Sequence, residues 1–188
     1  MKNLLTFAFS GLLLWSSCSS PDYSKELAEI DALRVTVVRT DSVLKRIDKE
    51  RAELLHKEIS TNAQYIQFNV NKLKDTLDKN TAFLLTEYKA LRKEFELVAD
   101  QHKKLSAALD SINMSLDNLQ HDLKNKSLAE GLVAADCVKK ESEQVNEAYK
   151  IAGEMRSIYD QSLIAFDSLS PKVKDYIQVM NSKLMLQK

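Results

Sequence analysis

The side chains of this sequence that could do chemistry are three histidines, one internal cysteine and many carboxylates. His56, His102 and His121 lie far apart, and none has a second histidine four residues later, as a zinc-binding helix would. The Glu-x-x-His pattern of di-iron bundles occurs once, at Glu53, whereas such a site needs two. We therefore predict no metal, no cofactor and no catalytic residue, and we expect that the protein is not an enzyme.

Cys137 is the one cysteine beyond the first eighteen residues. No recognisable motif places a base beside it, so we expect a small buried apolar residue next to Val138 rather than a nucleophile. Intermolecular pairing or thiol reactivity is the alternative. Acidic residues such as Asp41, Asp48 and Glu50 recur on amphipathic segments, where carboxylates usually form the solvated face.

The composition excludes several other kinds of protein. The 27 basic and 27 acidic residues balance, whereas nucleic-acid binding favours a basic excess. No glycine falls between Gly11 and Gly131, and no proline between Pro21 and Pro171. Turn-rich β folds and glycine-rich phosphate loops need those residues. We therefore predict a helical protein with no nucleic-acid partner.

The elements that must position these residues are organised around the stretch 84–123. Apolar residues recur there every three or four positions, as in a coiled coil, and His102 is the single polar exception. This central seam comprises Leu84, Tyr88, Leu91, Phe95, Val98, His102, Leu105, Leu109, Ile112, Leu116, Leu119 and Leu123. We expect His102 to fix register or helix pairing. Small and neutral residues flank the seam, which favours a bundle of three or more helices over a dimeric rod.

Further apolar stripes predict the remaining helices. The first runs through Leu27, Ile30, Leu33, Val37, Leu44, Ile47 and Leu54, and the second through Ala63, Ile66, Val70, Leu73 and Leu77. The third runs through Ala134, Val138, Val145, Ala148, Ala152, Met155, Tyr159, Phe166 and Leu169, with Glu141 and Ser162 as exceptions. These stripes predict an all-α fold, an antiparallel bundle or coiled coil of three long helices plus a short C-terminal helix.

Three positions are predicted to interrupt the helices. The first turn falls near residues 78–81 or near residues 56–62, and we favour 78–81 because it divides the body more evenly. The second follows Asn125, where the sequence from Ser127 to Glu130 fits a capping box that begins a new helix. The third lies at Ser170 and Pro171, which we expect to end the third long helix and to cap the short last one.

The N-terminal segment gives the clearest indication of where in the cell the protein is located. A short basic start precedes an apolar run from Leu4 to Trp15, which is too short to span a bilayer but matches a signal-peptide core. Ser16, Ser17 and Cys18 follow, and this segment resembles the lipobox of bacterial lipoproteins. Trp15 stands where that family usually has leucine.

The resemblance implies that residues 1–17 are a signal peptide and that Cys18 is lipidated. Residues 18–22 would then be a lipidated tether, and residues 23–188 the helical domain. Cys18 would carry diacylglycerol and a further acyl chain such as palmitate, which together anchor a protein stably. Ser19 after the cysteine implies outer-membrane sorting in the cell envelope, on either the periplasmic or the surface side. The alternative is an ordinary secretory signal with Cys18 incidental.

Two hypotheses for function follow. In the first, the chain is a lipid-anchored envelope protein whose bundle is a structural spacer or an adaptor for an envelope protein or a second copy of itself. In the second, the bundle is a binding module that docks a partner's helix or an apolar ligand. An exposed apolar row at Tyr65, Phe68 and Phe83 would support docking.

Overall fold

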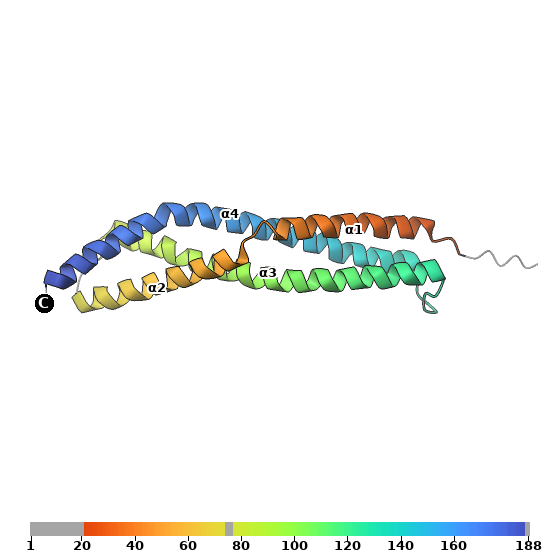
Figure 1. Ribbon diagram of the computed structural model, residues 1–188, viewed down its shortest axis with the longest axis horizontal. Coiled ribbons are helices and arrows are strands. Elements are labelled where there is room, and N and C mark those ends of the chain that lie inside the picture. Colours follow the sequence, from red (N-terminus) through yellow and green to blue (C-terminus); the bar gives the residue numbers. More distant parts are fainter. Residues whose placement is uncertain (1–20, 74–76, 187–188) are drawn as a thin grey trace, which may run out of the picture.

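The computed structural model describes residues 21–73 and 77–186 of the chain. Its elements are α1 (Ser24–Leu44), α2 (Lys49–Leu73), α3 (Lys79–Asn125) and α4 (Ala134–Leu186). No strand occurs within the described ranges, so the predicted all-α class is confirmed. The helices form an elongated rod in which α3 and α4 run side by side along most of the length (Figure 1).

The rod is a three-helix bundle whose first member is broken in two. Helices α1 and α2 follow one another along the rod, α3 runs back antiparallel to them, and α4 reverses again (Figure 1). Helix α1 packs mainly on α4, whereas α2 packs mainly on α3. Both halves of the first member thereby cover the apolar stripes of the two longer helices.

The central seam forms the core of α3. Ten of its twelve predicted positions are buried, from Tyr88 to Leu123, while Leu84 and His102 are half-buried. Leu85 is buried in place of Leu84 at the start of the helix. A 3.5-residue repeat keeps one stripe facing its partners over a long helix, and the same stripe therefore serves both α2 and α1 along α3.

The first chain reversal lies close to the favoured position. Helix α2 ends at Leu73 and α3 begins at Lys79, so the reversal falls just before residues 78–81. Asp78 caps α3: its side chain accepts from the backbone N–H groups of Asn80 at 2.9 Å and Thr81 at 3.0 Å. These hydrogen bonds, with one from the Thr81 hydroxyl, hold the pKa of Asp78 below its usual range. The alternative turn at residues 56–62 lies inside α2.

A break at residues 45–48 was not predicted. Buried residues follow a heptad spacing through Ile30, Leu33, Val37, Thr40, Leu44 and Ile47, then resume at Ala52, Leu55, Ile59 and Ile66. Ile47 and Ala52 are five residues apart where the repeat needs four, so one extra residue interrupts the phase. The expectation that Leu54 lies on the stripe was wrong, because it is exposed and Leu55 is buried instead.

The break is closed by local and long-range hydrogen bonds. The backbone N–H groups of Arg46 and Ile47 donate to carbonyls three residues earlier, and Asp48 caps α2 by accepting from the Arg51 N–H at 2.8 Å. Arg156 of α4 reaches across, donating to the Arg46 carbonyl while its Nε contacts Asp160 Oδ2 at 2.7 Å. The guanidinium thus satisfies a carbonyl that the end of α1 leaves without a helical partner.

Replacing Arg156 tests this contact. We expect Arg156→Ala to lower the free energy of unfolding by about 1–2 kcal/mol, because it removes a charged donor from a helix end. Urea titration followed by far-UV circular dichroism measures the change. Lys150→Ala, at an exposed position of the same helix, is the matched control and should stay within about 0.5 kcal/mol of the parent. Equal effects of the two substitutions would contradict the capping role.

The predicted capping box does not begin α4. Lys126 adopts a left-handed conformation at φ 54°, and Ser127 N–H donates to the Asp122 carbonyl at 2.9 Å. Together with the bond from Lys126 N–H to the Leu123 carbonyl, this is the pattern that closes a helix C-terminus. Ser127 therefore ends α3, and α4 begins only at Ala134, after a loop that contains Gly131 at φ 84°.

The short C-terminal helix was also a wrong expectation. Helix α4 continues through Pro171 to Leu186 as one element of 53 residues. Proline removes one backbone donor, but Phe166, Ser170 and Val173 stay buried on either side of it, so tertiary packing holds the helix together. Figure 1 shows α4 curving toward its C-terminus.

Candidate interaction surfaces at the two ends of the bundle

The three histidines are dispersed along the rod. His56 contacts the carbonyl of Arg92 on α3 through Nδ1 at 3.1 Å, His102 is half-buried in the seam, and His121 is exposed beside Asp122. Within residues 21–73 and 77–186, no group of three or more His, Cys, Asp or Glu side chains could hold a metal ion. Of the three, His56 makes a contact between neighbouring helices, from α2 to α3.

A polar and aromatic layer lies inside the half of the bundle that contains α2. Phe166 of α4 stacks on Tyr88 at 6.0 Å between ring centroids and meets Phe95 edge-on at 6.3 Å. The Tyr88 hydroxyl accepts from Nδ2 of Asn62 at 3.0 Å, and burial raises the pKa of Tyr88, so the phenol stays neutral. The layer therefore links α2, α3 and α4 through Asn62, the two aromatic residues of α3, and Phe166.

Two polar residues interrupt the apolar stripe of α4, as the sequence indicated. Ser162 is buried and donates to Glu94 Oε2 of α3 at 2.6 Å. Glu141 is half-buried, and its Oε2 atom has no hydrogen-bond partner in the described part of the chain. Ser162 therefore contributes a specific cross-helix contact, whereas the structure gives no account of Glu141.

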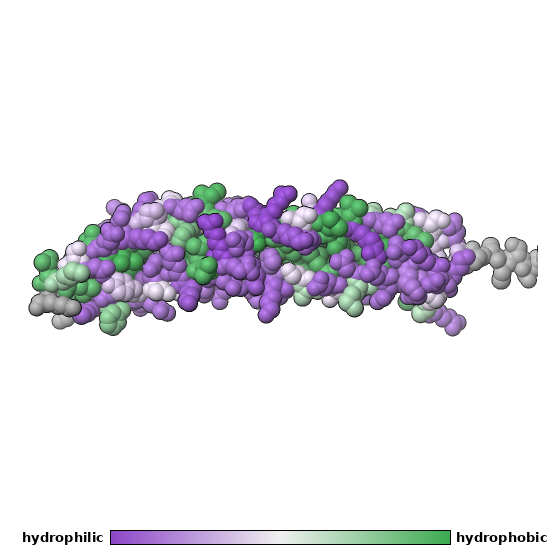
Figure 2. Space-filling view, viewed as in Figure 1, coloured by the Kyte–Doolittle hydropathy of each residue, from purple (hydrophilic) through white to green (hydrophobic). Residues whose placement is uncertain are grey.

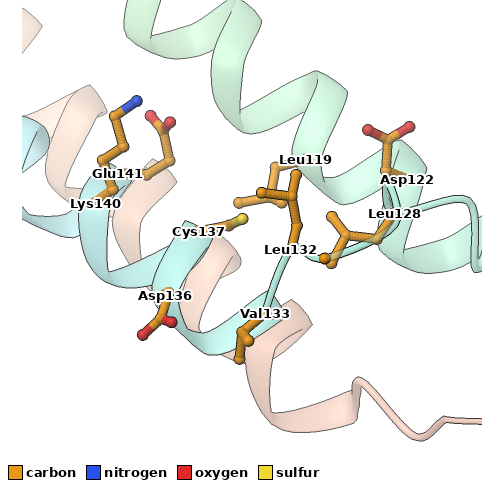
Figure 3. A pocket seen from close by; sticks show the side chains of 10 residues that line it. Leu119, Asp122, Leu128, Leu132, Val133, Asp136, Cys137, Lys140 and Glu141 are labelled. Atoms are coloured by element: carbon orange, nitrogen blue, oxygen red, sulfur yellow. The ribbon is translucent and has the colours of Figure 1, made fainter.

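Cys137 lies at the edge of a hollow near the start of α4. The hollow has a volume of about 470 Å³ and opens to solvent. In Figure 3, Cys137 and Leu132 point toward Leu119 of α3, whereas Asp136 and Val133 point away. The expectation of a buried thiol was only partly right, because Cys137 is half-buried and packs at the rim of the core.

The end of the rod that holds this hollow is the basal end, which we define by residues 21–27 and 122–137. The start of α1, the end of α3 and the start of α4 meet there (Figure 1). Asp22 accepts from the Ser24 N–H at 3.0 Å; hydrogen bonds from Ser24 lower the pKa of Asp22, and the charge of Lys126 lowers it further. The loop of residues 126–133 therefore lies beside the point where the N-terminal chain enters the bundle.

The opposite end carries exposed apolar side chains. Phe68 of α2 is 68% exposed and Phe83 of α3 is 63% exposed, and Tyr65 is also exposed, as the sequence hypothesis for docking required. Three residues near the end of α4 join them, so that the apolar tip comprises Tyr65, Phe68, Phe83, Val179, Met185 and Leu186. Figure 2 shows apolar side chains at this end of the molecule.

A shallow groove runs between α3 and α4 on the side of the rod. It has a volume of about 700 Å³ and is lined by Leu105, Ala108, Ser111, Ile112, Lys140, Glu143, Gln144, Glu147, Ala148 and Ile151. Its apolar lining consists of leucine, isoleucine and alanine side chains, and lysine and glutamate side chains form part of the remainder. The groove is open rather than enclosed, so it suits a helix better than a small apolar ligand.

Comparison with known proteins returned no relative. The chain matches no protein-family model, no curated protein and no solved structure. Among the described helices, none is both long and apolar enough to cross a membrane. Cys18 and the segment of residues 1–17 lie outside the described residues, so the lipobox interpretation stays a prediction.

The sequence alone did not identify some of the exposed apolar residues at the basal end and at the apolar tip. Leu132 and Val133 were assigned to no stripe, and Val179, Met185 and Leu186 were not recognised as exposed. The sequence does show each of them as a large apolar residue that lies either off the buried stripe of its helix or in a loop. Such residues occur singly on many surfaces, and only the meeting of chain ends in space gathers them.

Proposed function

We propose that this chain is a lipid-anchored protein of the bacterial cell envelope, sorted to the outer membrane, whose helical rod is a spacer and adaptor. Cys18 carries the acyl chains, and the apolar tip contacts a partner protein. The observation that carries the proposal is that the start of α1 and the apolar tip lie at opposite ends of the bundle (Figure 1).

The dimensions of the rod suit a spacer. Helix α4 has 53 residues, and a helix rises about 1.5 Å per residue, so α4 reaches about 80 Å. The tip is therefore held tens of ångströms away from the basal end. Paired long helices resist bending better than a single helix, because each apolar stripe is covered along its length.

The surface of the tip suits an adaptor. Aromatic side chains are enriched at protein interfaces, and contiguous exposed apolar residues mark interaction sites more often than scattered ones do. Hydrophilic residues occupy much of the remaining surface, as Figure 2 shows on one face. The second hypothesis, a docking module for a partner helix, is supported by the side groove between α3 and α4.

Site-specific photo-crosslinking in intact cells tests the adaptor role. We expect a photoreactive residue at Phe83 to form an adduct with another envelope protein, and the additional change Phe68→Asp to reduce that adduct several-fold, because it places a charge in the apolar contact. Leu54→Asp is the matched control. Leu54 is an exposed apolar residue on nearly the same face of α2, two heptads nearer the basal end.

The outcomes separate the hypotheses. An adduct at Phe83 that Phe68→Asp weakens and Leu54→Asp leaves unchanged supports the adaptor. An adduct that contains only this chain assigns the tip to self-association. Adducts from probes at Ala108 and Ile151 in the side groove, with none at the tip, would favour the helix-docking module and contradict the adaptor role of the tip.

A further inference from the structure

We propose that the loop between α3 and α4, residues 126–133, makes a second contact with the membrane by inserting Leu132 and Val133 into the lipid interface. This inference rests on the proposed acylation of Cys18. The occupant of this surface is a lipid bilayer, and the contact would fix the orientation of the rod on the membrane as well as its attachment.

The first step of the argument is the length of the tether. Six residue steps separate Cys18 from Ser24, where α1 begins, and an extended chain covers at most about 3.6 Å per residue. An acyl group on Cys18 therefore holds the start of α1 within about 20 Å of the bilayer surface. The apolar tip, at the far end of the rod, lies well beyond that reach (Figure 1).

The second step is the position of the loop. It follows the end of α3 and precedes α4, at the same end of the rod as Ser24 (Figure 1). The Lys126 charge also lowers the pKa of Asp22, which agrees with this shared end. A surface to which the tether attaches is therefore within reach of this loop.

The third step is the chemistry of the loop. Leu132 is 55% exposed and Val133 is 58% exposed, while Leu128 packs inward against the core. Gly131 adopts φ 84°, a conformation that favours glycine and shapes the turn just before the exposed pair. Val133 points away from the hollow and can enter the acyl boundary of a bilayer directly, whereas Leu132, which points toward Leu119, must turn outward to follow it (Figure 3). The helices remain in water.

The fourth step concerns charge. Lysines and carboxylates alternate around the loop, as Asp122, Lys124, Lys126, Glu130, Asp136 and Lys139 show. A balanced set of charged side chains is attracted only weakly to anionic headgroups, whereas membrane binding by a polybasic segment would depend on those headgroups. The contact is therefore apolar in origin, and its strength should change little with the proportion of anionic lipid.

Fluorescence of a single tryptophan tests the insertion. The sequence has one tryptophan, Trp15, within the segment that signal cleavage would remove, so the mature chain would have none. Val133→Trp then supplies the only indole. The acylated protein, purified from cells, is reconstituted in phosphatidylcholine vesicles with brominated acyl chains, which quench an inserted indole. Phe68→Trp, an exposed position in the apolar tip, is the matched control.

We expect bromolipids to quench Val133→Trp at least about twofold more than Phe68→Trp, and to do so equally with and without phosphatidylglycerol. Equal quenching at the two positions, in protein that floats with the vesicles, would overturn the loop contact and leave the anchor intact. Protein that does not float would overturn the anchor and the loop contact together. Far-UV circular dichroism checks that both variants keep the parent helicity. As an independent readout, we expect the inserted loop of the vesicle-bound protein to resist added protease and Val133→Asp to make it cleavable.

Discussion

Replacing Phe166 with alanine is expected to lower the free energy of unfolding by about 3–5 kcal/mol. Phe166 is buried between Tyr88 and Phe95 of α3, with ring centroids 6.0 Å and 6.3 Å away. Truncation removes the transfer free energy of the ring, leaves a cavity in a packed layer and loses both aromatic contacts. Urea titration, followed at 222 nm by circular dichroism, measures the loss as a lower midpoint.

Ile164→Ala is the matched control for Phe166→Ala. Ile164 lies two residues earlier on α4 and is 72% exposed, so it faces away from the layer. Its removal should change the free energy of unfolding by no more than about 0.5 kcal/mol. If Phe166→Ala cost as little as Ile164→Ala, the aromatic layer would not be part of the core in solution.

The second large effect is expected from Cys18→Ser. Each buried methylene of an acyl chain contributes about 0.8 kcal/mol to membrane binding, so several chains hold the protein far more tightly than one. We expect the substitution to abolish incorporation of labelled palmitate and to reduce the membrane-bound fraction at least about tenfold. Metabolic labelling and washing of isolated membranes measure the two quantities.

Cys137→Ser supplies the control within the same chain, because the sequence contains only these two cysteines. It should keep both the label and the membrane attachment. Palmitate that stayed on the Cys18→Ser protein, or tight attachment without any label in the parent, would refute the lipoprotein interpretation. The second result would instead favour the alternative that the N-terminal segment is an ordinary secretory signal peptide and that Cys18 is not lipidated.

Much of the fold could be predicted because a heptad repeat is a local property. The stripe of α3 specifies which side of that helix is apolar, and ten of its twelve predicted positions are buried. His102 illustrates the limit: its half-burial fits the expected structural position, but no contact of the described structure establishes which pairing it specifies. A change of phase and poor helix formers occur both near residues 78–81 and near residues 56–62, and the position before Asp78 was favoured only because it divides the body more evenly.

The break at residues 45–48 could not be predicted in the same way. A stripe drawn from Ile47 to Leu54 reads as continuous, and Ala52, the residue that is buried, carries a weak apolar signal. Pro171 was misinterpreted for the opposite reason. A proline ends a helix unless the neighbouring turns are held by packing, and that packing comes from the rest of the bundle.

The candidate surfaces likewise divide into features that the sequence predicts and features that only the tertiary structure reveals. The lipobox resemblance and the exposed row at Tyr65, Phe68 and Phe83 come from short stretches of sequence. The basal end and the apolar tip exist only because the chain reverses direction twice and brings distant segments to common ends (Figure 1).

The sequence by itself therefore determined the helical class and most of the buried stripes, since each depends on residues within a few turns of one another; the lipid anchor stays a prediction. Tertiary structure decided where the first helix breaks, whether α4 continues past Pro171 and which exposed apolar residues share an end of the rod. Those features depend on what packs against each helix, because burial is a property of neighbours in space and not of neighbours in the chain.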